Sequence, residues 1–254
     1  MLSGLSGRST AYLEQLFLRT TTISTAITRL LAQTPGWELY LLNRGSHNDE
    51  VINDSTPTLH SIIVDINDEE KVDKMLGDMQ FDVVCDFIGF VPEQLERDHR
   101  LFRNRTRQFM YISSASAYQK PLSSPYITEG TPLANPYWLY SRNKIACEEL
   151  LMRYYREEGF PITIVRPSHT YGDKGIPVAV HGAKGSWQVI SRIKQGKPVI
   201  IPGDGTTLWT VTHNTDFAKA FVGLMGNAHA IGESFQITSD EVLGNIFKHF
   251  CIGK

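Results

Sequence analysis

The sequence predicts a doubly wound α/β fold, with helices on both faces of a parallel sheet, followed by a small C-terminal lobe. Short, almost continuous apolar runs alternate with helical patterns through residues 37–166. Such runs are typical of strands buried on both faces, and their alternation with helices favours right-handed crossovers. Residues 167–235 are richer in glycine and proline and favour a smaller, less regular lobe.

Each element is expected from a local pattern. Strands are expected at Trp37–Leu42, Ser61–Val64, Asp82–Phe87, Gln108–Ser113 and Ile162–Arg166. Helices are expected at Ile23–Gln33, Glu69–Met79, Pro92–Arg103 and Pro136–Glu158. Pro92 and Pro136 suit a first helical turn, and Gly159 ends the long helix. A helix near Asn214–Met225 and a strand near Ser234–Thr238 come after the irregular region.

Composition and charge exclude several classes of protein. The 254 residues are 41% hydrophobic, and their formal net charge of −2 excludes a generally basic nucleic-acid binder. No apolar run reaches the ~18–20 residues of a membrane helix, and the N-terminus lacks the apolar core of a secretory signal. Cys85, Cys147 and Cys251 form no CxxC pair, which predicts reduced thiols, no metal site and a cytoplasmic protein.

Side chains that could carry chemistry lie just after the strand at Gln108–Ser113. Ligands of open α/β sheets bind beyond the carboxyl ends of the strands, so the hydroxyl-rich segment Ser113–Tyr118 is a candidate. The alternative is a plain serine-rich turn. Tyr140 and Lys144, spaced i, i+4 on the long helix, share one face. An ammonium beside a phenol lowers the phenol pKa, which makes tyrosine a usable general acid or base.

These residues resemble the extended short-chain dehydrogenase/reductase superfamily, the NAD(P)-dependent epimerases and dehydratases of nucleotide sugars. The resemblance covers about residues 22–240. It rests on YISSASAY at 111–118, YSRNK at 140–144, VRPSHTYG at 165–172, PGDG at 202–205 and THNTD at 212–216. It implies a Rossmann-type NAD(P)-binding domain at 1–166, with returning elements from 210–238, and a substrate-binding lobe at 167–254.

By position, the resemblance implies three catalytic residues. Ser114 matches the serine that hydrogen-bonds the reacting oxygen, and Tyr140 matches the general acid/base. Lys144 matches the residue that tunes Tyr140 and holds the nicotinamide ribose, so Tyr140 and Lys144 are also cofactor-binding candidates. Pro167 and His169 fall in the segment that passes the nicotinamide in relatives; the alternative for His169 is a loop histidine in a polar pocket.

The segments after the strands Trp37–Leu42 and Ser61–Val64, the second and third strands of the family fold, suggest which nucleotide is bound. NAD-selective relatives usually carry an acid after the second strand, which bonds the ribose 2′-hydroxyl and repels a 2′-phosphate. This chain has Arg44 there, which favours NADP over NAD unless Arg44 is simply an exposed loop residue. Asp65 and Ile66 resemble the pair that contacts the adenine; the alternative for Asp65 is a turn residue.

The expected phosphate-binding turn departs from the family pattern. Relatives open with a strand, here Leu13–Leu18, and a Gly-x-x-Gly-x-x-Gly turn that lets the backbone reach the pyrophosphate. The three glycine positions hold Leu18, Thr21 and Ser24, and a Cβ at these points obstructs the turn. We therefore expect weakened or absent dinucleotide binding unless the loop finds another path. The remaining candidates for contact with the cofactor in this turn are Thr20, Thr22 and Ile23.

The residues directly after Ser114 limit which reactions of the superfamily are expected. Dehydratases of the superfamily carry an Asp-Glu pair there, whereas this chain has Ala115 and Ser116, which argues against 4,6-dehydration. The expected activity is epimerisation or reduction of a nucleotide sugar or related carbinol, with hydride passing to the nicotinamide while Tyr140 takes the hydroxyl proton. Relatives continue well past a strand like that near Thr238, so the substrate lobe is expected to be incomplete.

A noncatalytic role is the alternative. Five arginines lie between Arg97 and Arg107, and Arg97, Arg100 and Arg103 share one helix face if the helix ends near Arg103. This pattern predicts a solvated helix face or an RNA contact surface; stem-loop-binding members of the superfamily are associated with RNA. Relatives often form homodimers through a four-helix interface, for which Pro92–Arg103 and Pro136–Glu158 are the candidates.

Overall fold

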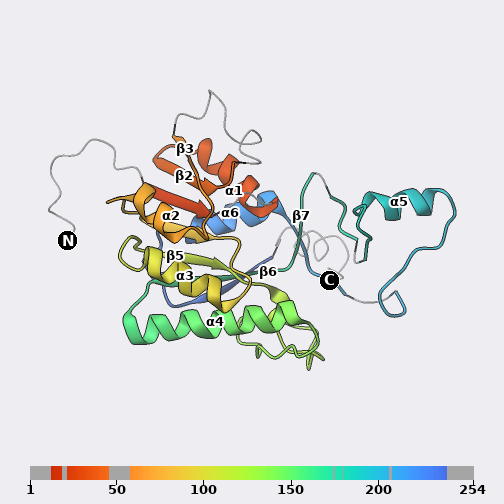
Figure 1. Cartoon of the computed structure of the whole chain (residues 1–254). Coiled ribbons are helices and arrows are strands. Elements are labelled where there is room, and N and C mark those ends of the chain that lie inside the picture. Colours follow the sequence, from red (N-terminus) through yellow and green to blue (C-terminus); the bar gives the residue numbers. More distant parts are fainter. Residues whose placement is uncertain are drawn as a thin grey trace, which may run out of the picture.

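The computed structural model describes residues 13–18, 22–45, 58–173, 175–178, 180–205 and 208–238. Within these residues, seven parallel strands form one sheet in the order β3-β2-β1-β4-β5-β6-β9 (Figure 1). The strands are β1 Leu13–Leu18, β2 Trp37–Asn43, β3 Leu59–Ile63, β4 Val83–Asp86, β5 Phe109–Ile112, β6 Ile162–Pro167 and β9 Ser234–Ile237. This is the Rossmann strand order with one added strand, and it confirms the predicted fold class.

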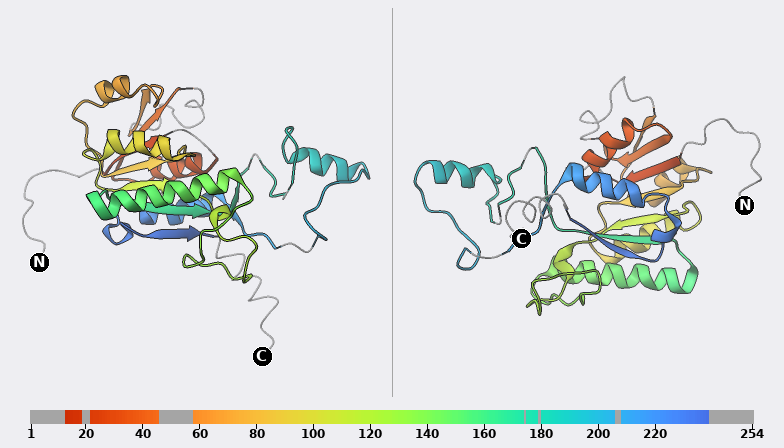
Figure 2. Two further views of the ribbon diagram at one scale, coloured as in Figure 1. Left: turned by 60° about the horizontal axis from the view of Figure 1, so that its bottom comes forward. Right: turned by 180° about the vertical axis from the view of Figure 1, so that it is seen from behind.

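Helices cover both faces of the sheet, as predicted. The helices are α1 Thr22–Ala32, α2 Glu69–Leu76, α3 Pro92–Phe102, α4 Leu139–Glu158 and α6 Asn214–Leu224. One core cluster joins the sheet to α2, α3 and α4 through residues such as Val72, Leu95 and Leu151. The second joins it to α1 and α6 through residues such as Ile27 and Phe221 (Figure 2). No described helix is long and apolar enough to cross a membrane.

Two helix ends differ from the predicted bounds by three residues, each for a local reason. The long helix α4 begins at Leu139 rather than Pro136, because the Asn135 side chain accepts a hydrogen bond from the Tyr137 amide (3.1 Å) and holds the preceding residues in a turn. Helix α2 stops at Leu76, since Gly77 takes a positive φ of 50° that ends the helix. The C-terminal end of α4 falls at Gly159 in the left-handed conformation, as expected.

The region after β6 is less regular. Strands β7 His169–Tyr171 and β8 Val211–His213 form a separate two-stranded parallel sheet, and α5 Trp187–Lys194 lies between them in the chain. In Figures 1 and 2, α5 stands away from the main sheet, and it buries no side chain. Strand β9 then returns to the main sheet beside β6.

Candidate active site

The candidate catalytic residues meet at the carboxyl edge of the sheet. Strand β5 ends at Ile112, and the chain runs through Ser114 into the short 3-10 helix η2 Ala115–Ala117. Ser114 has extended backbone and caps this helix, its Oγ accepting a hydrogen bond from the Ser116 amide at 3.1 Å. Tyr140 lies in the first turn of α4, close enough to Ser114 for the serine hydroxyl to act on the phenol pKa. The structure therefore brings together the hydroxyl and the phenol that the sequence predicted as partners.

Tyr140 is half-buried among aromatic side chains. Its ring lies 4.8 Å from the Trp138 ring and 6.4 Å from the Phe90 ring, centroid to centroid. Burial raises the pKa of the Tyr140 phenol, and the hydrogen bond with Ser114 opposes this rise. The phenol therefore stays protonated near neutral pH in this structure and has a hydroxyl partner that stabilises its anion.

Lys144 is positioned by backbone carbonyls. Its side chain is buried, and its Nζ donates to the carbonyl oxygens of Gly89 and Ile112, each at 2.7 Å. The Nζ also lies 5.7 Å from the centroid of the Tyr140 ring. Burial lowers the Lys144 pKa to about 8. The expected lowering of the Tyr140 pKa by Lys144 is not seen here: burial dominates, and the ammonium group is held by the two carbonyls.

A hydroxyl network behind Ser114 escaped the sequence analysis. Ser114 Oγ donates to Ser116 Oγ (2.9 Å), which also accepts from the buried Ser141 Oγ (3.0 Å). Asn135, also buried, donates to the Ser116 carbonyl (2.8 Å) and to Ser141 Oγ (3.3 Å). Ser116 stands where dehydratases would have a carboxylate, and here it orients Ser114. A serine directly after Tyr140 was the available sequence signal for Ser141.

A buried ion pair fixes α4 against the sheet. Glu148, one turn beyond Lys144, accepts from Nε and Nη2 of Arg166 on β6, and the closest N–O distance is 2.7 Å. Ser113 Oγ donates to the same carboxylate. Both charged side chains are buried, so each compensates the desolvation of the other. This contact fixes the position of α4, and therefore of Tyr140 and Lys144, relative to β5 and β6.

The first nucleotide-binding candidates lie at the start of α1. Thr22 is exposed, its carbonyl accepts from Asn214 Nδ2 (3.2 Å), and Ile23 packs against the second core cluster. Ser24, at the third glycine position, is buried, so the helix packing accommodates its Cβ. Thr20 and the second glycine position, Thr21, lie outside the described residues. The burial of Ser24 concerns the packing of α1, and the weakened or absent dinucleotide binding expected from this turn stays a prediction.

The candidates after β2 and β3 take different roles. Arg44 comes directly after β2 and is exposed at the carboxyl edge, where a nucleotide ribose would lie. Asp65 is exposed, and its Oδ1 accepts from the Asn67 amide (3.0 Å) and side-chain amide (2.9 Å), which is a turn contact. Ile66 is buried in the first core cluster, so its side chain serves packing in this structure.

Pro167 and His169 lie at the far end of the same edge. Pro167 is the last residue of β6 and is paired in register with Ile237 of β9. His169 begins β7; it is half-buried, and its ring lies edge-on to Trp209 at 5.4 Å. Burial lowers the His169 pKa. These contacts are compatible with either of the two roles considered for this histidine.

The arginine cluster is largely neutralised by ion pairs. Four of its side chains contact carboxylates, in the pairs Arg97–Asp98, Arg100–Glu69, Arg105–Asp73 and Arg107–Asp82. The predicted shared exposed face of Arg97, Arg100 and Arg103 is wrong, because Arg97 is buried against Asp98 and donates to Asn67 (2.8 Å).

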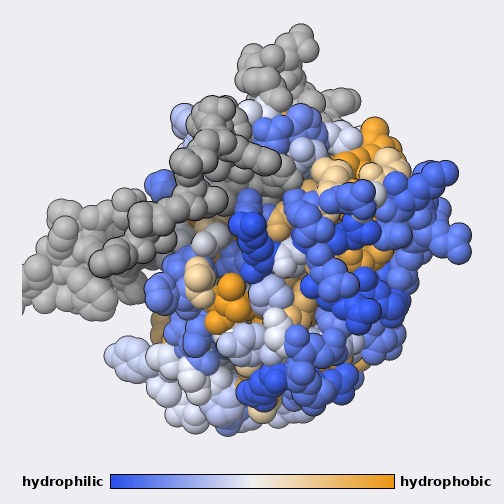
Figure 3. Space-filling model, turned by 90° about the vertical axis from the view of Figure 1, so that its left-hand side faces the viewer, coloured by the Kyte–Doolittle hydropathy of each residue, from blue (hydrophilic) through white to orange (hydrophobic). Residues whose placement is uncertain are grey.

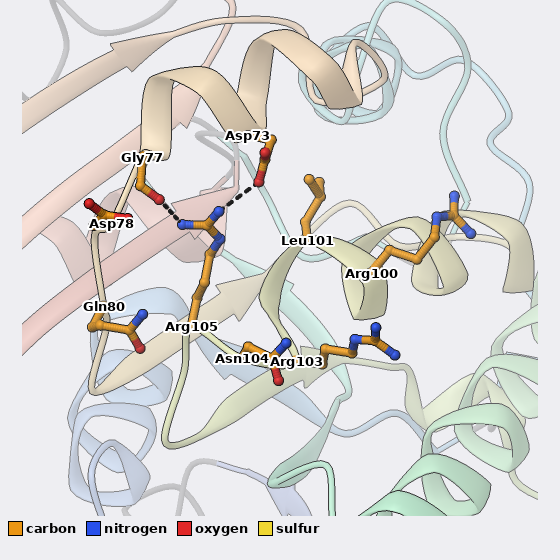
Figure 4. A pocket seen from close by; sticks show the side chains of 9 residues that line it. All are labelled: Asp73, Gly77, Asp78, Gln80, Arg100, Leu101, Arg103, Asn104 and Arg105. Atoms are coloured by element: carbon orange, nitrogen blue, oxygen red, sulfur yellow. Dashed lines mark hydrogen bonds and ion pairs between the residues drawn. The ribbon is translucent and has the colours of Figure 1, made fainter.

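A polar cavity of about 380 Å³ adjoins these arginines (Figure 4). Arg105 crosses it to reach Asp73 and the Gly77 carbonyl. Residues 77–80 lead into β4 and 103–105 lead into β5, so the cavity lies at the amino edge of the sheet, opposite Tyr140. This cavity is therefore separate from the candidate active site. The face of the molecule on the left of Figure 1 is mainly hydrophilic (Figure 3).

Comparisons with known proteins identify the family of this chain. The fold and the Ser-Tyr-Lys arrangement define a Rossmann-type protein of the dinucleotide-binding class. The model of the NAD dependent epimerase/dehydratase family matches residues 20–238. The chain belongs to this family.

Curated relatives differ in their names. The chain is 28% identical over 197 residues to the chloroplast stem-loop binding protein of 41 kDa b of Arabidopsis thaliana, covering 78% of this chain and 48% of that protein. It is 31% identical over 150 residues to a dTDP-glucose 4,6-dehydratase of Haemophilus influenzae, covering 57% of this chain and 43% of that protein. The chain thus spans less than half the length of these relatives.

Solved structures share the fold. A dTDP-glucose 4,6-dehydratase of Bacillus anthracis in complex with NAD matches with a TM-score of 0.71 at 18% identity, covering 93% of this chain and 80% of that chain. A UDP-glucuronic acid 4-epimerase of Bacillus cereus in complex with UDP-glucuronic acid and NAD matches with a TM-score of 0.71 at 20% identity, covering 90% and 78%.

Proposed function

We propose that this chain is an NAD(P)-dependent epimerase or reductase acting on a nucleotide sugar or related carbinol. The observation that carries the proposal is the placement of Ser114 and Tyr140 next to each other at the carboxyl edge, with Lys144 fixed one turn further along α4. This arrangement offers one group that exchanges a proton, a second that bonds the same oxygen, and a cation nearby. The names of the dehydratase and epimerase relatives support the substrate class.

Each residue has a defined task in this proposal. Tyr140, which is protonated in this structure, donates its proton to a substrate carbonyl, and in the reverse direction its phenolate takes the proton of the substrate hydroxyl. Ser114 hydrogen-bonds the reacting oxygen and stabilises the Tyr140 anion. Lys144 provides a positive charge close to the phenol, held by two carbonyls. The Ser116–Ser141–Asn135 network holds Ser114 in place.

The nicotinamide cofactor, when bound, supplies the hydride acceptor and donor. The residues proposed to hold it are Thr22 and Ile23 at the start of α1, Arg44 after β2, and Pro167 and His169 after the sheet. Arg44 is free of an acidic neighbour in the sequence and stands where a 2′-phosphate would lie, which supports NADP as the preferred nucleotide. Residues 167–254 are proposed to form the substrate lobe.

Dehydration is not part of the proposal. The family position for a catalytic carboxylate holds Ser116, whose hydroxyl is occupied by Ser114 and Ser141. Elimination of water needs an additional acid or base at that point, whereas epimerisation and reduction need only the hydroxyl-phenol pair and the cofactor. Among the reactions suggested by the relatives, the site residues support these two.

The experiment is a comparison of Tyr140→Phe with wild type under saturating oxidised nucleotide (NADP⁺ or NAD⁺) and UDP-sugar or dTDP-sugar substrates. Loss of the phenol oxygen removes the proton-transfer group, so turnover is expected to fall by about 10²–10⁴ while nucleotide binding is retained. Tyr126→Phe, at a tyrosine that is 83% exposed, is the matched control and keeps full turnover. Wild-type turnover that survives Tyr140→Phe refutes the assignment.

A second candidate, noncatalytic RNA binding, is favoured by the name of the Arabidopsis relative alone. The pairing of four arginines with carboxylates weighs against a contact surface built on the whole Arg97–Arg107 segment. If RNA binds here, its affinity falls steeply with salt and drops in the double variant Arg100→Ala, Arg103→Ala. A salt-insensitive or absent RNA signal removes this candidate.

A further inference from the structure

Two fully buried aspartates lie beneath the candidate active site and have no task in the proposed reaction. Asp86 is the last residue of β4, and Asp98 lies in the middle of α3. Both side chains have no exposed surface. An isolated buried carboxylate is strongly unfavourable, so each group needs a partner that explains its presence.

Asp86 organises the loop that holds Lys144. Its Oδ1 accepts hydrogen bonds from the amides of Ile88 (2.7 Å) and Gly89 (3.0 Å). The carbonyl of the same Gly89 accepts from Lys144 Nζ and from the Tyr111 hydroxyl, the latter at 3.0 Å. The Asp86 carboxylate therefore fixes the peptide that in turn fixes the Lys144 ammonium.

The second oxygen of each aspartate points to a shared proton. Among the described residues, Oδ2 of Asp86 and Oδ2 of Asp98 are buried and have no hydrogen-bond donor, and each carboxyl group affects the pKa of the other. Two neighbouring ionised carboxylates repel, whereas one shared proton would supply the donor that both Oδ2 atoms lack. Burial raises the pKa of both groups, and for Asp98 the neighbouring Asp86 charge raises it further.

The charged groups around Asp86 and Asp98 determine which side chains interact with the single negative charge of the pair. Arg97 donates from Nε to Asp98 Oδ1 at 2.8 Å, whereas Asp86 interacts with both Lys144 and Arg97, and its charge opposes the effect of burial on the Lys144 pKa. The other titratable groups around this cluster are Cys85 on β4, Tyr111 on β5, and Tyr140, Cys147 and Glu148 on α4. Glu148 is already paired with Arg166.

We infer that Asp86 is a positioning residue for Lys144, and that it shares one proton with Asp98 so that the pair keeps a single negative charge facing the lysine. The pair places the Gly89 carbonyl and supplies the counter-charge of the buried ammonium. A contribution of the Asp86–Asp98 pair to catalysis rests on the proposed function, whereas the shared proton and the charge on Lys144 do not.

Infrared spectroscopy at pH 7 tests the shared proton without cofactor or substrate. Wild type is expected to show the C=O stretch of a protonated carboxyl group, and both Asp86→Asn and Asp98→Asn are expected to lose it. Asp82→Asn, at a carboxylate paired with exposed Arg107, is the matched control and keeps the band. Absence of the band in wild type, or its survival in either variant, overturns the inference.

NMR titration of ¹³C-methylated lysines, with Lys144 assigned from a Lys144→Arg variant, tests the positioning role. Asp86→Asn is expected to lower the Lys144 pKa by about one unit or more from its wild-type value, because a close opposite charge is lost. Asp98→Asn leaves Asp86 ionised, so the Lys144 pKa is expected to stay level or rise. An unchanged Lys144 pKa in Asp86→Asn, or an equal fall in Asp98→Asn, overturns the inference.

The two variants keep the test decisive if one of them does not fold. Asp98→Asn substitutes an amide that can donate to Asp86, so it retains a hydrogen bond across the pair. Wild type and Asp98→Asn alone still decide whether a proton is shared. Because neither readout needs turnover, an inactive but folded protein that shows both expected results would refute the proposed function and leave this inference intact.

Discussion

The Gly89→Ala substitution tests how closely the loop under Lys144 is packed. A Cβ added at Gly89 would lie 2.6 Å from Leu95 Cδ2 and 3.1 Å from Tyr111 Cε2, and closer still to Asp86 Oδ2. These neighbours are buried, so the methyl group must displace the loop or the side chains around it. Overpacking of this kind costs about 1–3 kcal/mol, which corresponds to a fall in Tm of about 2–12 °C for a domain of this size.

Gly223→Ala is the control for this prediction, because it makes the same chemical change in open space. A Cβ at Gly223, within helix α6, meets no atom within 4 Å. Alanine is favoured over glycine in a helix, so stability is expected to stay level or rise by up to about 1 kcal/mol. Thermal unfolding of both variants beside wild type is the assay. A Gly89→Ala protein as stable as Gly223→Ala would refute the reasoning.

Three further predictions rest on single contacts. Arg44→Ala is expected to weaken NADPH binding about tenfold and to leave NADH binding unchanged, measured by fluorescence titration; equal losses for both nucleotides contradict the assignment. Because the Lys144 pKa is lowered from 10.5 to about 8, wild type should gain about 3 kcal/mol over Lys144→Met between pH 8 and pH 10.5. In urea unfolding, a constant difference across that range contradicts it. Glu148→Gln leaves Arg166 buried without its counter-charge and should cost about 3–5 kcal/mol of unfolding free energy, whereas a loss below 1 kcal/mol would show that the pair is dispensable.

Much of the fold could be predicted because its strands are buried on both faces. Segments such as Val83–Asp86 and Ile162–Pro167 are mostly apolar without alternation, and this signal does not depend on tertiary context. Boundaries depend on particular side-chain contacts instead. The start of α4 is set by the hydrogen bond from the Tyr137 amide to Asn135, which periodicity does not register.

The site was predicted where the chemistry lies in side chains of fixed spacing. Ser114, Tyr140 and Lys144 are of this kind, and the structure brings them to one edge. The carbonyls of Gly89 and Ile112 that hold Lys144 were not predictable, because a backbone acceptor leaves no signature in the residue type.

For the arginine segment Arg97–Arg107, the residue types alone do not predict the contacts. Its residue types suggest a basic surface, and only the structure places acidic partners beside them. Two of the partners, Glu69 and Asp73, lie on α2, 31 and 32 residues away in the chain from Arg100 and Arg105. Pairings at that separation are set by how α2 and α3 pack, which local sequence does not determine.

Titration of the protein with NADPH and NADH tests the central claim most directly, namely that the carboxyl edge of this sheet holds a nicotinamide cofactor beside Tyr140. Trp138, with its ring 4.8 Å from that of Tyr140, provides an intrinsic donor for energy transfer to a reduced nicotinamide. We predict saturable quenching of tryptophan emission by both nucleotides, with NADPH bound more tightly, and a reduced signal in Trp138→Phe. No saturable binding of either nucleotide would contradict the account.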